Sequence, residues 1–111
     1  ISTNNGISID TKSGIDEICM DLGSETSRFR REMIKAMETK TKLIVLIEER
    51  RFRTISDVVT WKNPNHAKKA VFMDGKELAR RMRTAEISYG VSFEFCAKNN
   101  TGKRMLQLLR G

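Results

Sequence analysis

The sequence predicts an α/β domain with a small, mostly parallel central sheet flanked by helices. Segments of strand type at 7–12, 42–48 and 91–96 alternate along the chain with segments of helical periodicity. The segment 42–48 is continuously apolar between its charged ends, as in a central strand covered on both faces. The link between this strand and the helix before it is very short, which favours a βαβ unit with two parallel strands.

Length and composition indicate one globular domain spanning residues 1–111. The 39% of hydrophobic residues and 32% of charged residues are typical of a soluble protein. The longest unbroken apolar run, 43–47, is far too short to span a membrane. The net charge of +7 points to a polyanionic partner, most often nucleic acid, and a basic protein without such a partner is the alternative.

The chain has two cysteines, Cys19 and Cys96, and one histidine, His66. These numbers argue against a zinc site and against a Cys-His or Ser-His-Asp catalytic group. Both cysteines lie in apolar surroundings far apart in the sequence. We expect two buried free thiols in a reducing, cytoplasmic environment.

The segment 7–12 carries the most informative polar residues. In a strand its odd-numbered residues share an apolar face, while Asp10 and Lys12 share the other face at the strand's exit. Ser-Gly then breaks the strand, and a helix over 15–22 begins with Asp16 in its first turn. A carboxylate, an ammonium and a second carboxylate in this arrangement are consistent with a small divalent-metal site.

The spacing Asp/Glu-x-Lys is weak by itself, because it occurs three times, at Asp10, Glu38 and Asp74. Only at Asp10 does an apolar strand precede it and a further acid, Asp16, follow the lysine by four residues. The alternative is purely structural. Asp10 and Lys12 would form an ion pair, and Ser13 would form a capping box with Asp16.

Three further helices follow from hydrophobic periodicity. One spans 27–40 after N-cap candidates at 24–27, and one spans 76–88 and is ended by Gly90. The last begins at Asn100 or Thr101. The segment 50–75 is predicted to be an irregular insertion that contains one short helix capped by Ser56.

Several motifs together resemble a known family. The stretch 10–16 resembles the Glu-Arg-Lys-x-x-x-Asp motif of the XPF-type structure-specific endonuclease domain, a branch of the PD-(D/E)xK restriction-endonuclease-like nucleases. Arg28-Phe29 with Glu32 is similar to that family's Arg-Leu-x-x-Gln segment. The stretch 45–48 is similar to its strand ending in Leu-Ile-Glu. Residues 89–91 and Thr101 fit the remainder, so the resemblance covers about 7–49 and 76–110.

The resemblance implies a metal-dependent DNA endonuclease that hydrolyses phosphodiester bonds on branched, flapped or junction DNA in repair or recombination. Asp10 and the backbone carbonyl of Thr11 would bind Mg²⁺ or Mn²⁺. Lys12 would orient the attacking water or stabilise the transition state. Asp16 would tune Lys12, and an interaction with the helix dipole is its structural alternative.

The family's matching arginine lies beside the metal, which makes Arg28 the best candidate for a DNA contact. The basic run Arg50, Arg51 and Arg53 could follow a phosphate backbone, as could Lys68 and Lys69, and a solvated charge run explains them equally well. Parallel strands end at one edge of the sheet. We therefore expect Glu48 close to Asp10 and Lys12 as a supporting acid.

The sequence also departs from the family pattern. Asp10 replaces a glutamate and Thr11 replaces an arginine. The family's catalytic Gly-Asp lies on an earlier strand, and residues 1–9 contain no carboxylate. We therefore expect N-terminal strands to be missing and the domain to be incomplete for catalysis.

Two alternatives to an active nuclease follow from these departures. The first is a catalytically inactive nuclease-fold module that binds DNA or a partner protein, and the second is an interaction domain without nucleic acid. The family also leads us to expect a homodimer and further domains in a larger polypeptide.

Overall fold

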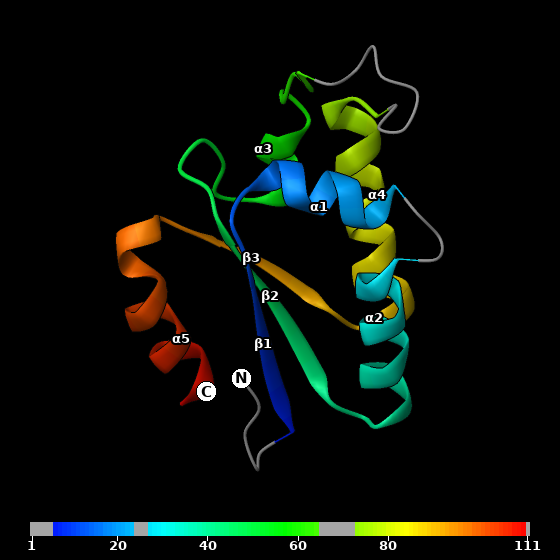
Figure 1. The fold of residues 1–111 in the computed structure, drawn as a ribbon, viewed down its shortest axis with the longest axis vertical. Helices are drawn as coiled ribbons and strands as arrows, with labels where there is room; N and C mark the ends of the chain where they lie inside the picture. The colour runs from blue at the N-terminus through cyan, green and yellow to red at the C-terminus, as the bar shows by residue number, and fades with distance from the viewer. Residues whose placement is uncertain (1–5, 24–26, 65–72, 111) are drawn as a thin grey trace.

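The computed structural model describes residues 6–23, 27–64 and 73–110, and it has an α/β architecture (Figure 1). Strands and helices follow in the predicted order, which confirms the predicted fold class at this level. The elements are β1 (Ile7–Lys12), α1 (Ile15–Leu22), α2 (Arg28–Glu38), β2 (Lys42–Glu48), α3 (Ile55–Val58), α4 (Gly75–Tyr89), β3 (Ser92–Cys96), a 3₁₀ turn (Lys98–Asn100) and α5 (Thr101–Leu109).

The three strands form one sheet in the order β1-β2-β3, and both neighbouring pairs are parallel. β2 lies in the centre, and residues 43–47 within it are all buried, as its continuous apolar sequence predicts. All three carboxyl ends lie at the upper edge of the sheet in Figure 1. Residues that follow β1, β2 and β3 therefore meet at this edge.

Helices cover both faces of the sheet, so the domain has three layers (Figure 1). The larger core joins one face to α1, α2, α3 and α4, and it contains Phe29, Met33, Val45, Ile47 and Met82, all at most 2% exposed. The smaller core joins the other face to α5. It consists of Ile9, Ile44 and Leu46, with Met105, Leu108 and Leu109 packed against them.

The ends of α2 and α3 show how local hydrogen bonds place these helices. Ser27 caps α2, because its Oγ accepts a hydrogen bond of 3.1 Å from the backbone N–H of Arg30. α3 is capped by Thr54, whose backbone N–H donates to Asp57 Oδ2 over 3.1 Å. The predicted cap at Ser56 is therefore wrong, because Ser56 lies within the helix.

In the segment 50–75 the structure describes 50–64, which contains α3, and 73–75, where α4 begins, while 65–72 lies outside the described residues. Trp61 is 5% exposed and belongs to the larger core. Gly75 lies directly against it, because a Cβ atom here would be 2.7 Å from the Trp61 carbonyl oxygen. The described residues of this segment therefore extend the larger core.

Cys19 is buried and Cys96 is half-buried, and both are free thiols. Burial is the main cause that raises the pKa of Cys19. The prediction of a buried thiol is thus correct for Cys19 and too strong for Cys96. In the described parts of the chain, no helix is long and apolar enough to cross a membrane.

Candidate functional site

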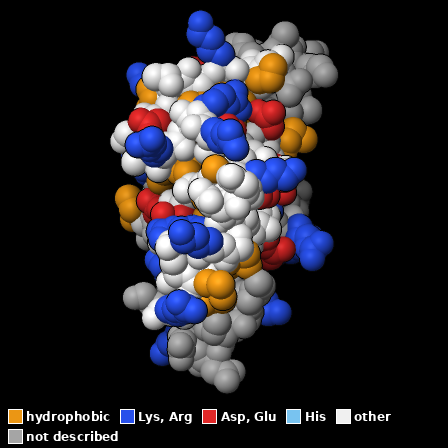
Figure 2. Space-filling model, turned by 90° about the vertical axis from the view of Figure 1, so that its left-hand side faces the viewer, with side chains coloured by type: hydrophobic (Ala, Val, Ile, Leu, Met, Phe, Trp, Pro, Cys, Tyr) orange, Lys and Arg blue, Asp and Glu red, His pale blue; other side chains and the backbone are white. Residues whose placement is uncertain are grey.

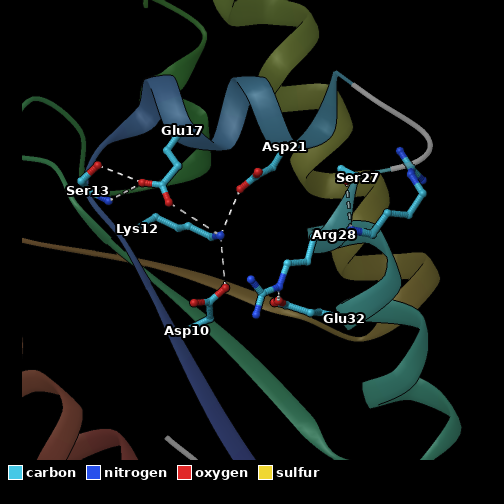
Figure 3. A network of polar contacts seen from close by, with 9 residues as sticks. Asp10, Lys12, Ser13, Glu17, Asp21, Ser27, Arg28 and Glu32 are labelled. Atoms are coloured by element: carbon cyan, nitrogen blue, oxygen red, sulfur yellow. Dashed lines mark hydrogen bonds and ion pairs between the residues drawn. The ribbon is translucent and has the colours of Figure 1, made fainter.

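The polar face of β1 forms the centre of a charged cluster. The alternation of side chains along this strand turns Asp10 and Lys12 toward the helices α1 and α2 (Figure 3). Lys12 Nζ lies 3.2 Å from Asp10 Oδ2, 3.1 Å from Asp21 Oδ2 and 3.8 Å from Glu17 Oε1. We call these four residues the Lys12 cluster.

The helix α1 supplies the two carboxylates that the sequence analysis did not select. Glu17 and Asp21 are four residues apart and so lie on one face of the helix. The opposite face is fixed in the core by Ile15, Ile18, Cys19 and Leu22. The i, i+4 spacing of two acids on an amphipathic helix was a usable signal for this arrangement.

Asp16 does not take part in the ion pairs of Lys12. Its side chain is exposed, and its charge acts on Arg51, whose charged form it favours. One residue along a helix corresponds to a rotation of about 100°. This rotation between neighbouring residues therefore turns the carboxylate of Glu17, and not that of Asp16, toward β1.

Glu17 also closes the turn between β1 and α1. Its Oε2 accepts hydrogen bonds from Ser13 N over 3.1 Å and from Ser13 Oγ over 2.9 Å. The predicted bond between Ser13 and Asp16 is thus replaced by one with Glu17. Burial alone would raise the pKa of Glu17, but the bonds from Ser13 and the charge of Lys12 outweigh it and lower the pKa.

The environment of Lys12 strongly favours its charged form. The Lys12 side chain is only 12% exposed, and its Nζ lies 5.1 Å from the ring centroid of Phe29. Burial opposes ionisation, but contact with Asp21 and the charge of Asp10 outweigh it and raise the pKa of Lys12. Asp21 Oδ2 is buried without a hydrogen bond of good geometry among the described residues, so Lys12 is the group that compensates its charge.

Glu48 lies on the opposite face of the sheet, so the prediction that it approaches Asp10 and Lys12 is wrong. Lys12 pairs in register with Ile47, and the next residue of β2 therefore points away from Lys12. Glu48 Oε2 instead accepts a hydrogen bond of 2.6 Å from Thr101 Oγ1 at the start of α5. Its interaction connects β2 with α5.

Glu49, the residue directly after β2, is the acid that reaches the turn after β1. Its Oε2 accepts a hydrogen bond of 3.3 Å from the backbone N–H of Ile15, and its Oε1 accepts one of 2.9 Å from Arg51 Nε. The Glu49 side chain is only 10% exposed. Hydrogen bonding from Arg51 is the main cause that lowers the pKa of Glu49. This contact fastens the end of β2 to the start of α1.

Arg28 lies on the side of α2 that faces Asp10, but its side chain is 88% exposed (Figure 3). It forms an ion pair with Glu32, in which Nε and Oε1 are 3.2 Å apart. A groove of about 350 Å³ separates β1 from α2, and its lining includes Asp10, Glu32 and Lys35. Arg28 is therefore placed to meet a ligand that lies along this groove.

The basic run after β2 divides into two environments. Arg51 is held by Glu49 and lies with its guanidinium carbon 5.4 Å from the ring centroid of Phe52. Arg50 and Arg53 are exposed and line a groove of about 450 Å³ that reaches Asn100 beside α5. Lys68 and Lys69 lie outside the described residues.

The residues of the site supply only part of a magnesium coordination shell. Asp10 offers a carboxylate, and the exposed Thr11 offers a backbone carbonyl beside it. The carboxylates of the Lys12 cluster, however, converge on an ammonium rather than on a shared open point. Within the described residues, no group of three or more His, Cys, Asp and Glu side chains is arranged to hold a metal ion.

Comparisons of the chain with known protein families, with curated proteins and with solved structures found no match.

Proposed function

We propose that this chain is the metal-dependent DNA endonuclease domain of a larger protein and acts on branched, flapped or junction DNA. The observation that supports this most is the position of Asp10 and Lys12. They lie side by side at the carboxyl end of β1, in a parallel sheet. Ligands of α/β sheets bind outside the carboxyl ends of the strands, so this edge is where a substrate would be processed.

The residues at this edge suit phosphodiester hydrolysis. The ammonium of Lys12 would stabilise the negative charge that develops on the scissile phosphate. Mg²⁺ or Mn²⁺, when bound by Asp10 and the carbonyl of Thr11, would supply charge neutralisation and an activated water. The remaining ligands would come from outside the described residues or from the DNA phosphate itself. Asp16 has no direct role in the hydrolysis proposed here.

Basic surfaces on both sides of this edge support DNA as the substrate. Arg28 lies on the side of α2 that faces Asp10, while Arg50 and Arg53 line the groove beside α5. α5 itself contains Lys103 and Arg104 and no acidic residue. Figure 2 shows the side of the molecule that carries α5, where Lys and Arg side chains are spread among Asp, Glu and hydrophobic side chains. Such a distribution favours contacts with phosphates rather than with base edges.

A specific observation favours a second candidate, a catalytically inactive module that binds DNA or a partner protein. Lys12 is nearly buried and is compensated by three carboxylates, as expected for a residue that fastens β1 to α1. A lysine in this state stabilises the fold without contacting a phosphate. The basic surfaces would then bind DNA without cleavage.

Metal binding and DNA binding can be tested separately in the full-length protein. We would titrate Mn²⁺ and follow paramagnetic broadening of the β1 amides by NMR, with Asp10→Asn as the test and Glu38→Gln as the control. Glu38 has the same Asp/Glu-x-Lys spacing as Asp10 but lies at the end of α2. Fluorescence anisotropy with flapped DNA at increasing salt would measure the electrostatic part of binding.

Nuclease function predicts broadening centred on Asp10 that disappears in Asp10→Asn and persists in Glu38→Gln. Salt-dependent DNA binding without this broadening would favour the inactive module. Absence of salt-dependent DNA binding would refute the nuclease and the DNA-binding form of the inactive module, and it would leave only a module that binds a partner protein.

A further inference from the structure

A second basic groove lies between α2 and α4, away from the Lys12 cluster. Its volume is about 310 Å³. Three arginines and three hydroxyl-bearing residues contribute to its lining, namely Arg30, Arg80, Arg81, Thr84, Ser88 and Tyr89. Guanidinium groups together with hydroxyls are the donors that recognise oxyanions.

The strongest indication of a ligand in this groove comes from Arg30. It follows Arg28 by two residues, which corresponds to a rotation of about 200° around α2 and places the two side chains on opposite sides of the helix. Arg30 Nε is buried and has no hydrogen-bond partner among the described residues. Its Nη1 donates to the Tyr89 hydroxyl over a long 3.4 Å. A buried donor without an acceptor costs free energy, and a bound oxyanion would remove this cost.

The other two arginines are held in place by the protein. Glu77 accepts from Arg80 Nε over 2.7 Å and from Arg81 Nε over 2.9 Å. These bonds, led by the one from Arg80, lower the pKa of Glu77 to about 2, so the carboxylate stays charged at neutral pH. Arg81 Nη1 also donates to the carbonyl of Leu22 over 2.9 Å. Arg80 and Arg81 thus share the charge of one carboxylate, and Arg30 forms no ion pair among the described residues, so the three arginines leave an excess of two positive charges.

From this geometry we propose that the groove between α2 and α4 binds a phosphoryl group. A phosphate monoester carries nearly two negative charges at neutral pH and several acceptor oxygens, which match the excess charge and the donors of the groove. A rotation of the Arg30 side chain would bring its Nε–H, which is covered in the free protein, to one phosphate oxygen. The hydroxyls of Thr84 and Ser88, which line the groove, would donate to other phosphate oxygens. Phosphate binding in this groove is independent of the proposed nuclease activity at Asp10, because the groove lies on the other side of α2.

The experiment follows the Arg30 Nε–Hε resonance by ¹⁵N NMR while inorganic phosphate is added to the full-length protein at constant ionic strength. We expect a saturable shift of this resonance. In Arg30→Gln, phosphate affinity measured by calorimetry should fall about 10-fold or more. The matched control is Arg83→Gln, which removes the same charge from α4 at a residue that donates instead to Ser56.

Two further measurements make the outcome decisive. Arg30→Lys keeps the charge, is expected to fold, and should also lose affinity because it lacks the Nε–H donor. A 5′-phosphorylated dinucleotide that binds more tightly than inorganic phosphate would identify a nucleic-acid end as the source of the group, and equal binding would identify free phosphate. The proposal is overturned if phosphate causes no saturable shift of Arg30, or if Arg83→Gln weakens binding as much as Arg30→Gln.

Discussion

Replacement of Lys12 by methionine should destabilise the fold through the carboxylates that it leaves behind. Methionine retains most of the apolar stem that packs near Phe29, so the substitution mainly removes the charge. Asp21 Oδ2 is buried, and Lys12 Nζ is 3.1 Å from it. Without the ammonium this oxygen carries an uncompensated charge in a region that water scarcely reaches.

The expected loss can be bounded from exposure. Removal of one partner from a fully buried ion pair costs about 3–5 kcal/mol. Lys12 is 12% exposed, but Asp10 is 32% exposed and Glu17 is 40% exposed, so solvent screens part of the effect. We therefore expect Lys12→Met to lower the free energy of unfolding by about 2 kcal/mol at neutral pH.

The loss should also depend on pH in a defined direction. The pKa of Lys12 is raised, so its contribution is complete below the ordinary value of 10.5 and is lost as the pH rises through the raised pKa. The pKa of Glu17 is lowered, so its contribution is present above 4.5 and is lost as the pH falls through the lowered pKa. The difference in free energy of unfolding between wild type and Lys12→Met should be largest between these two pH limits. It should become smaller in acid.

Urea denaturation followed by circular dichroism at neutral pH and near pH 3 would measure both effects. The control is Lys103→Met on the exposed surface of α5, which should change the free energy of unfolding by less than about 0.5 kcal/mol. The double variant Lys12→Met with Asp21→Asn should recover part of the loss. A loss in Lys12→Met no larger than in the control, or one that stays constant in acid, would refute this explanation.

Further predictions concern the glycines and Glu49. Gly75→Ala should cost about 3 kcal/mol, because its methyl group would lie 2.7 Å from the Trp61 carbonyl oxygen. Gly102→Ala in α5 meets nothing within 4 Å and should instead stabilise the protein by about 0.5–1 kcal/mol, so thermal unfolding of the two variants should shift in opposite directions. Glu49→Gln should lower the free energy of unfolding by about 1 kcal/mol at neutral pH. Because the pKa of Glu49 is lowered by Arg51, this loss should disappear as the pH falls through that pKa, and a constant loss between neutral and acid pH would contradict the assignment.

Hydrophobic periodicity was sufficient to predict the elements of this fold. The continuous apolar run at 43–47 identified the central strand because both of its faces are buried. Glycines that interrupt the helical pattern mark helix ends. Gly23 follows α1, and Gly90, whose φ of 71° lies in the left-handed region, ends α4. These signals are local, and the tertiary structure did not override them.

The details of the site could not be predicted because they depend on register and helix rotation. Glu48 was expected near Lys12 because parallel strands end together, but a register shift of one residue decides the face of the sheet. Similarly, Glu17 rather than Asp16 faces Lys12 because the core fixes the rotation of α1. The cap at Thr54, by contrast, could have been predicted, because the capping-box spacing from Thr54 to Asp57 is visible in the sequence.

The most direct test of the proposed function is a cleavage assay of the full-length protein with Mg²⁺ or Mn²⁺ on flapped and forked DNA. Asp10→Asn is the test variant and Glu38→Gln is its matched control, and circular dichroism would show that both are folded. The proposal predicts metal-dependent cleavage that Asp10→Asn abolishes and Glu38→Gln retains. DNA binding without cleavage under either metal, or equal cleavage by Asp10→Asn, would contradict it.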